Sequence, residues 1–213
     1  MGSKARIWAG KHLKGNKWNV WSVLLVIEFI FGIASGVIVT GTGSYEINNQ
    51  NSLSLLLESA LSILMLPMTI GMVFYLINLV HGKKFDIEQI FSKYSDIIRI
   101  FLVNVLKSVI VTLYTLLLII PGIIKSIEYA LTDYILADDD FNDLKTKEVL
   151  DLSKELMNGH KMEYFMLYLY YTLMIFLGVL TFGILWIWTI PEMTIANAKF
   201  ATLLLDEYKE KQR

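Results

Sequence analysis

Long apolar runs alternate with short polar stretches along this chain, and the polar stretches hold nearly all of its positive charge. The 213-residue sequence contains 19 Lys and Arg residues. Sixteen of them lie in four stretches, residues 1–17, 81–99, 138–162 and 206–213. The other candidate loops, at residues 41–52, 121–122 and 181–183, carry none. Such one-sided positive charge is typical of proteins with several membrane spans, whose basic loops stay in the cytoplasm.

The composition agrees with a membrane protein. Hydrophobic residues make up 55% of the chain and charged residues 18%, and the mean hydropathy is +0.53. Soluble domains have more charge, about 25% on average. A net charge of −1 provides no bulk attraction to nucleic acid, so we expect no nucleic-acid partner. The absence of cysteine excludes disulfides and thiolate metal ligands.

Six apolar runs predict six membrane-spanning helices. Crossing about 30 Å of hydrocarbon takes about 20 apolar residues. Four runs meet this length directly, and two shorter or more polar runs complete an even count that keeps every basic stretch on one side. The expected spans are about residues 19–40, 53–80, 98–120, 123–137, 164–182 and 183–205. The sequence therefore predicts one all-α domain over residues 1–213, a polytopic membrane helical bundle of the cell membrane with both termini in the cytoplasm.

Two segments between the spans have the apolar spacing of amphipathic helices. Apolar residues recur every three or four positions from Ile87 to Phe101 and again from Asp143 to Asn158, with polar residues opposite. We expect two cytoplasmic helices on the membrane face. Gly159 then follows the second segment, at a position where glycine commonly ends a helix.

Gly32 and Gly36 form a small-xxx-small pattern in the first apolar run. Small residues at this spacing let a second helix approach closely. We expect them to pack against another helix, either within the chain or in a dimer.

Ionisable residues inside the expected spans predict a polar interior. Each charge costs about 2.5–3.5 kcal/mol near the centre of a lone spanning helix, and Lys125, Glu128 and Asp133 all fall in the 123–137 run. Lys125 and Glu128 are one helical turn apart and can pair. The candidate residues of an intramembrane polar cavity are Asn104, Lys107, Tyr114, Lys125, Glu128, Thr132, Asp133, Glu192 and Lys199. The alternative is that Lys107 and Lys199 extend to the cytoplasmic surface while the acids pair or lie near the boundary.

The sequence contains no catalytic or metal-binding pattern. None of the three histidines has a second histidine at ligand spacing. The acidic cluster at residues 138–143 lacks the glycine and the glutamate of a calcium-binding loop, and it is better interpreted as a helix N-cap. We therefore expect no catalytic residue, no metal and no cofactor.

Three blocks carry a resemblance to a known family. They are Ile120–Lys125, Tyr134–Asp138 and Ser153–Lys161. In order and spacing they resemble the signature blocks of the YciC-like bacterial integral membrane proteins, a domain of unknown function numbered 975. The layout is also similar to the membrane domain of glycerophosphodiester phosphodiesterases, in which a separate soluble barrel is catalytic. The resemblance implies a non-catalytic bundle in a bacterial cytoplasmic membrane.

Further landmarks extend the resemblance over nearly the whole chain, at residues 13–16, 78–83 and 180–183 with Trp186. Two positions depart from the family pattern. Asp139 and Asp140 stand where the family usually has a proline, and Glu192 stands where an aromatic residue commonly follows Pro191. The family has no established active residues, so the resemblance assigns none to this chain.

Two functions fit the sequence. The leading hypothesis is a non-catalytic membrane protein whose partner is a membrane lipid, with an amphiphilic peptide or another membrane protein as the other partners considered. Its basis is the surplus of intramembrane charge without a catalytic grouping. The alternative is a small transporter or channel subunit, indicated by Pro67 and Pro191 inside spans and by the intramembrane carboxylates.

Overall fold

The computed structural model describes residues 1–42, 52–83 and 87–212, and within these ranges it contains helices and turns but no strand. The helices are α1 (Gly2–Thr42), α2 (Ser52–Val80), η1 (Ile87–Phe91), η2 (Tyr94–Asp96), α3 (Ile97–Leu117), α4 (Ile119–Glu128), α5 (Thr132–Ala137), η3 (Asp139–Phe141), α6 (Thr146–Leu156), α7 (Lys161–Leu180) and α8 (Trp186–Gln212). The predicted all-α class is confirmed. Most of the loop expected at 41–52 lies outside the described residues.

Four helical segments are long and apolar enough to cross a membrane. They are Lys17–Gly41, Ser52–Val80, Glu88–Leu117 and Lys161–Leu180. They coincide with four of the six expected spans, and they make the chain a membrane protein by the length and composition of its helices. In the described part of the chain, neither 123–137 nor 183–205 meets the same criteria, so the count of six stays a prediction.

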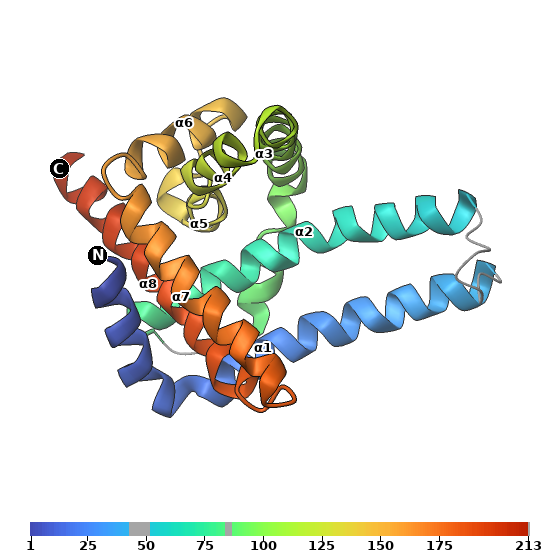
Figure 1. The fold of residues 1–213 in the computed structure, drawn as a ribbon. Coiled ribbons are helices and arrows are strands. Elements are labelled where there is room, and N and C mark those ends of the chain that lie inside the picture. Colours follow the sequence, from blue (N-terminus) through green and yellow to red (C-terminus); the bar gives the residue numbers. More distant parts are fainter. Residues whose placement is uncertain (43–51, 84–86, 213) are drawn as a thin grey trace.

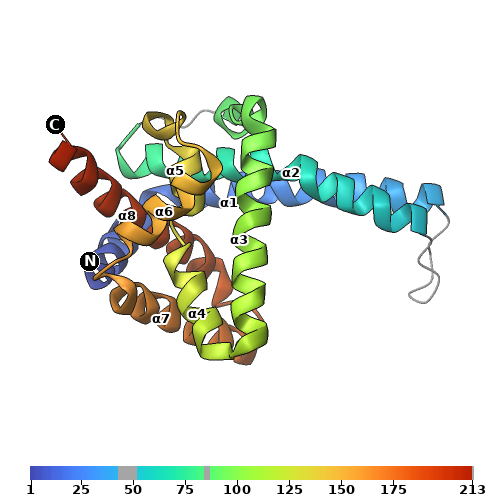
Figure 2. The ribbon, with the colours of Figure 1, turned by 90° about the horizontal axis from the view of Figure 1, so that it is seen from above.

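The helices do not all run in one direction. Figure 1 shows α1 and α2 side by side as a long hairpin that extends away from the other helices. α3 is seen end-on in Figure 1 and along its length in Figure 2, so it runs crosswise to α2. α1 bends, and its N-terminal part lies against α7 and α8. The core forms where α2, α5 and α8 meet, around buried side chains such as Tyr75, Leu136 and Phe200.

The apolar surfaces of the long helices differ in how much the chain itself covers. Half of the most apolar window of α2 is buried, but only 6% of that of α1 and 11% of that of α3. An exposed apolar surface this large marks a membrane or protein interaction site rather than an ordinary water-facing surface. The outer faces of α1 and α3 are therefore available to a membrane or to a protein partner.

The span expected over 123–137 is not one helix, and that prediction is wrong. α4 ends at Glu128, the chain turns over residues 129–131, and α5 begins at Thr132. Side chains take the place of the missing helical bonds: Ser153 Oγ donates to the Glu128 carbonyl oxygen at 2.9 Å, and Thr132 Oγ1 donates to the Tyr129 carbonyl oxygen at 2.7 Å. The bond from Ser153 satisfies a Glu128 carbonyl at the end of α4, and the Tyr129 carbonyl also accepts from the Thr132 backbone nitrogen at 3.3 Å.

Of the two expected amphipathic helices, only the second is present as a continuous helix. The first, over 87–101, is replaced by the short turns η1 and η2, followed by α3. The second is confirmed as α6, and Gly159 ends that region with a φ of +84°. The apolar face of α6 is nevertheless buried, with Val149 fully covered, and it packs against α3, α5 and α8. It therefore lies on protein rather than on the membrane.

Candidate functional site: a cavity between α3, α4, α5 and α7

A cavity of about 560 Å³ opens between α3, α4, α5 and α7. Aliphatic and aromatic side chains form most of its wall, and the charged groups on the wall are one lysine and one aspartate. The lining residues are Lys107, Ile123, Ser126, Ile127, Ala130, Asp133, Tyr164, Phe165, Tyr168, Leu169 and Thr172. The cavity therefore combines an apolar interior with one charged position.

Lys107 and Asp133 supply that charged position as an ion pair between α3 and α5. Lys107 Nζ lies 3.2 Å from Asp133 Oδ1 and 3.4 Å from Oδ2. The two side chains are 23% and 37% exposed, so a molecule in the cavity can reach them. The sequence predicted that both residues lie in a polar cavity. Their pairing could not be predicted, because 26 positions separate them.

Glu128 forms a second charged group next to the cavity. Its Oε2 accepts from Lys125 Nζ and its Oε1 from Lys161 Nζ, each at 2.6 Å. The Glu128 side chain is 7% exposed. The Lys125 ammonium also lies 5.0 Å from the centre of the Tyr114 ring. The predicted Lys125–Glu128 pair is thus present, and a second lysine ties α4 to the start of α7.

The remaining candidate residues do not join these two groups. Tyr171 Oη donates to Glu192 Oε1 at 3.2 Å, and Lys199 Nζ lies 5.1 Å from the centre of the Trp8 ring. Both contacts hold α8 to its neighbours, away from the cavity. Asn104 bonds to a carbonyl of its own helix, and Thr132 bonds within the turn before α5. The expected convergence of polar faces from three spans is therefore limited to α3, α4 and α5.

Gly32 and Gly36 do not serve as a packing site within this chain. A Cβ atom built on either glycine would meet nothing within 4 Å. The hairpin contact nearby is polar instead, since Ser35 Oγ donates to Glu58 Oε1 at 2.7 Å. The prediction of close packing inside the chain is wrong. The dimer alternative stays a prediction.

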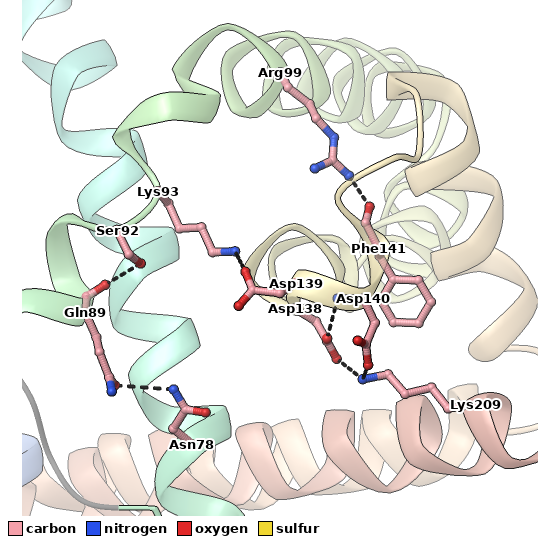
Figure 3. A network of polar contacts seen from close by, with 10 residues as sticks. All are labelled: Asn78, Gln89, Ser92, Lys93, Arg99, Asp138, Asp139, Asp140, Phe141 and Lys209. Atoms are coloured by element: carbon pink, nitrogen blue, oxygen red, sulfur yellow. Dashed lines mark hydrogen bonds and ion pairs between the residues drawn. The ribbon is translucent and has the colours of Figure 1, made fainter.

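The acidic cluster at 138–143 binds three elements together, and we call this set of contacts the charged clamp. It consists of Lys93, Arg99, Asp138, Asp139, Asp140 and Lys209 (Figure 3). Lys93 Nζ lies 2.6 Å from Asp139 Oδ1, and Lys209 Nζ lies 2.6 Å from both Asp138 Oδ2 and Asp140 Oδ2. The expected cap is present, since Asp138 accepts from the Asp140 backbone nitrogen at 3.1 Å.

The clamp joins residues far apart in the sequence by charge and by hydrogen bonding. Arg99 donates to the carbonyl oxygens of Phe141 and Leu144 at 2.6 and 2.9 Å. Burial lowers the pKa of Lys209, but its hydrogen bonds to Asp138 and Asp140 outweigh burial and raise that pKa above its ordinary value. The ammonium therefore stays charged at neutral pH. Among the described residues, no group of three His, Asp or Glu side chains is placed to hold a metal ion.

Comparison with known proteins gives one match. Residues 109–206 match the model of a family described as a protein of unknown function, DUF975. That range contains α4 to α7 and most of α8, hence all of the cavity wall except Lys107. Neither a curated protein nor a solved structure matches the chain significantly, so the similarity to the membrane domain of glycerophosphodiester phosphodiesterases stays a prediction. The match supports the resemblance of this chain to the YciC-like DUF975 family, whose function is unknown, over residues 109–206.

Proposed function

We propose that this protein is a non-catalytic, multi-pass protein of the cell membrane that binds an envelope phospholipid in the cavity between α3, α4, α5 and α7. The observation that carries the proposal is the combination of an apolar wall with one accessible ion pair, Lys107–Asp133. An acyl chain fits the wall, and a phosphate can take the place of Asp133 as the partner of Lys107.

The dimensions of the cavity support a ligand of this kind. Small-molecule sites usually measure about 300–1,000 Å³ and are mostly apolar, with a few polar groups that fix orientation. Here about 560 Å³ is available. Tyr164 and Tyr168 add aromatic surface on the α7 side, where a ring and its hydroxyl can meet both parts of an amphiphile.

Contacts between the basic stretches support a location in a membrane with these stretches on one side. The clamp joins the 81–99, 138–162 and 206–213 stretches, and His81 Nε2 lies 3.2 Å from Asp206 Oδ2. The amino group of Met1 pairs with Glu163, which brings the first stretch beside the third. Four positively charged segments gathered in this way suit the cytoplasmic face.

Lipid retention by purified protein tests the proposal. Native mass spectrometry of the detergent-solubilised protein should detect bound phospholipid. The double variant Lys107→Met with Asp133→Asn removes both charges without leaving one unpaired, and it should retain at least about tenfold less, because a charge-assisted hydrogen bond contributes about 1.5–3 kcal/mol. The matched control is Lys93→Met with Asp139→Asn in the clamp, which should retain lipid normally.

Equal lipid retention by both double variants, or no phospholipid on the parent protein, would contradict this function. Binding of an amphiphilic peptide in place of phospholipid would also contradict it.

The transporter alternative has one observation in its favour, the break between α4 and α5 beside the Lys107–Asp133 pair. Broken helices line substrate sites in transporters. A flux assay in proteoliposomes that compares the parent with Glu128→Gln and Lys125→Met tests it. Flux that depends on these residues would support transport, and no flux across a broad panel of ions and solutes would count against it.

A further inference from the structure

The turn between α3 and α4 exposes a continuous apolar surface. Leu116, Leu117, Leu118, Ile119 and Ile120 are 79%, 75%, 67%, 71% and 72% exposed. No charged residue occurs from Ser108 to Ile124, so the tip of the hairpin has no charged group that favours contact with water. A water-facing turn would normally contain polar residues.

Leu118 is hydrogen-bonded on both sides of this turn. The Leu118 nitrogen donates to the Tyr114 carbonyl oxygen at 3.1 Å, and the Gly122 nitrogen donates to the Leu118 carbonyl oxygen at 3.2 Å. The two arms also touch closely, because a Cβ on Gly122 would lie 2.7 Å from Thr115 Cα. Hydrocarbon tolerates a peptide chain only where its polar groups are paired internally. The tip meets that condition at Leu118.

The uncharged part of the hairpin is too short to cross a bilayer. Ten residues separate Lys107 from the turn, so this part of the arm is about 15 Å long at 1.5 Å per residue, and its depth in a bilayer is at most that. The returning arm α4 has ten residues as well and carries Lys125 and Glu128 in its second half. The hydrocarbon core is about 30 Å thick. The arms therefore reach at most roughly half of that thickness before charged side chains appear.

A half-depth position of the hairpin also explains how its charged residues avoid the hydrocarbon. A complete crossing would carry Lys107, Lys125, Glu128 and Asp133 into the hydrocarbon, where charged groups are costly. If the hairpin ends midway, these residues lie near the membrane boundary. Glu128 pairs there with Lys161, the first residue of α7.

α3 runs crosswise to α2 (Figures 1 and 2), so α3 and α2 cannot both stand along the normal of one flat bilayer. We infer that the α3–α4 hairpin enters the bilayer from the side of the charged clamp and ends in the hydrocarbon of that leaflet without crossing. The hairpin then adds no crossing, so the basic stretches that precede and follow it, 81–99 and 138–162, stay on the same side of the membrane.

Cysteine accessibility tests this inference, and the parent chain is suited to it because it contains no cysteine. Three single variants are compared: Leu118→Cys at the tip, Lys147→Cys at an exposed position of α6, and Ser52→Cys at the exposed start of α2. Each is treated with a membrane-impermeant maleimide in sealed right-side-out and inverted vesicles. Lys147→Cys and Ser52→Cys should react from opposite sides.

On each side of the membrane, Leu118→Cys should react at least about tenfold more slowly than the control that is accessible from that side. Once detergent dissolves the membrane, it should react at the same rate as the controls. An environment-sensitive fluorophore on the same cysteine should be quenched more by a mid-chain lipid quencher than by a headgroup quencher. Rapid labelling from the Ser52 side would show that α3 and α4 both cross, and rapid labelling from the Lys147 side would show that the tip lies in water. Either result overturns the inference.

Discussion

At the scale of single residues, one buried acid explains how this chain accommodates two lysines next to an apolar cavity. Glu128 uses one carboxylate oxygen for Lys125 and the other for Lys161, so each ammonium has a charged partner. The sequence predicted the first pair from helical spacing. The sequence gave no indication that Lys161 pairs with Glu128, because the two residues are 33 positions apart. The position of Lys161 in a basic stretch is already explained by the expected membrane topology. Only the fold brings Lys161 to Glu128.

Replacing Glu128 by glutamine should destabilise the protein. The change removes the shared negative partner of two lysines, one of which has a side chain only 17% exposed. Breaking a fully buried pair costs about 3–5 kcal/mol, and a value of about 2 kcal/mol is expected here because Lys161 is 37% exposed. Thermal unfolding in detergent measures the change. Glu155→Gln on the exposed face of α6 is the control and should shift stability by less than about 0.5 kcal/mol. Equal stability of the two variants would contradict the role of Glu128.

At the scale of elements, the α3–α4 hairpin depends on a proline and a glycine placed next to each other. Pro121 lies in the first turn of α4, where its missing N–H costs no helical hydrogen bond. Gly122 faces Thr115 so closely that a Cβ would lie 2.2 Å from Thr115 Oγ1. The sequence predicted a turn at Pro121–Gly122, but the structure places the turn at Leu118 and both residues in the first turn of α4. The end of α4 at Glu128 was not predictable, because the Glu128 carbonyl bonds to Ser153 of α6, which is 25 positions away in the sequence.

Gly122→Ala should therefore force the arms of the hairpin apart. Overpacking of this kind typically costs about 1–3 kcal/mol. Gly32→Ala is the matched control, because a Cβ there meets nothing within 4 Å and alanine favours the helix by up to about 1 kcal/mol. Unfolding in detergent should show that Gly122→Ala is less stable than the parent and that Gly32→Ala is equally or more stable. A strong destabilisation by Gly32→Ala instead would indicate that Gly32 packs against a second chain, and an unchanged Gly122→Ala would contradict the close contact with Thr115.

At the scale of the whole molecule, sequence patterns predicted the class of the fold better than its arrangement. Apolar length identified four long helices, and the grouping of lysines and arginines indicated stretches that the charged clamp does bring together. The patterns could not give the crosswise direction of α3, because periodicity describes one helix at a time. For the same reason they could not separate Glu192 and Lys199, which hold α8, from Lys107 and Asp133, which line the cavity.

The central claim is that a phospholipid occupies the cavity, and a variant that fills the cavity tests it most directly. Ser126 lines the cavity and its hydroxyl bonds only to the carbonyl of Ile123 in its own helix, so Ser126→Trp adds bulk without changing charge. Ser59 on α2 is the matched control, since it is exposed and makes the same kind of bond to Leu56. In equilibrium titrations with a fluorescent phospholipid, Ser126→Trp should bind at least about tenfold more weakly than the parent, while Ser59→Trp should bind normally. Unchanged binding by Ser126→Trp would contradict the account.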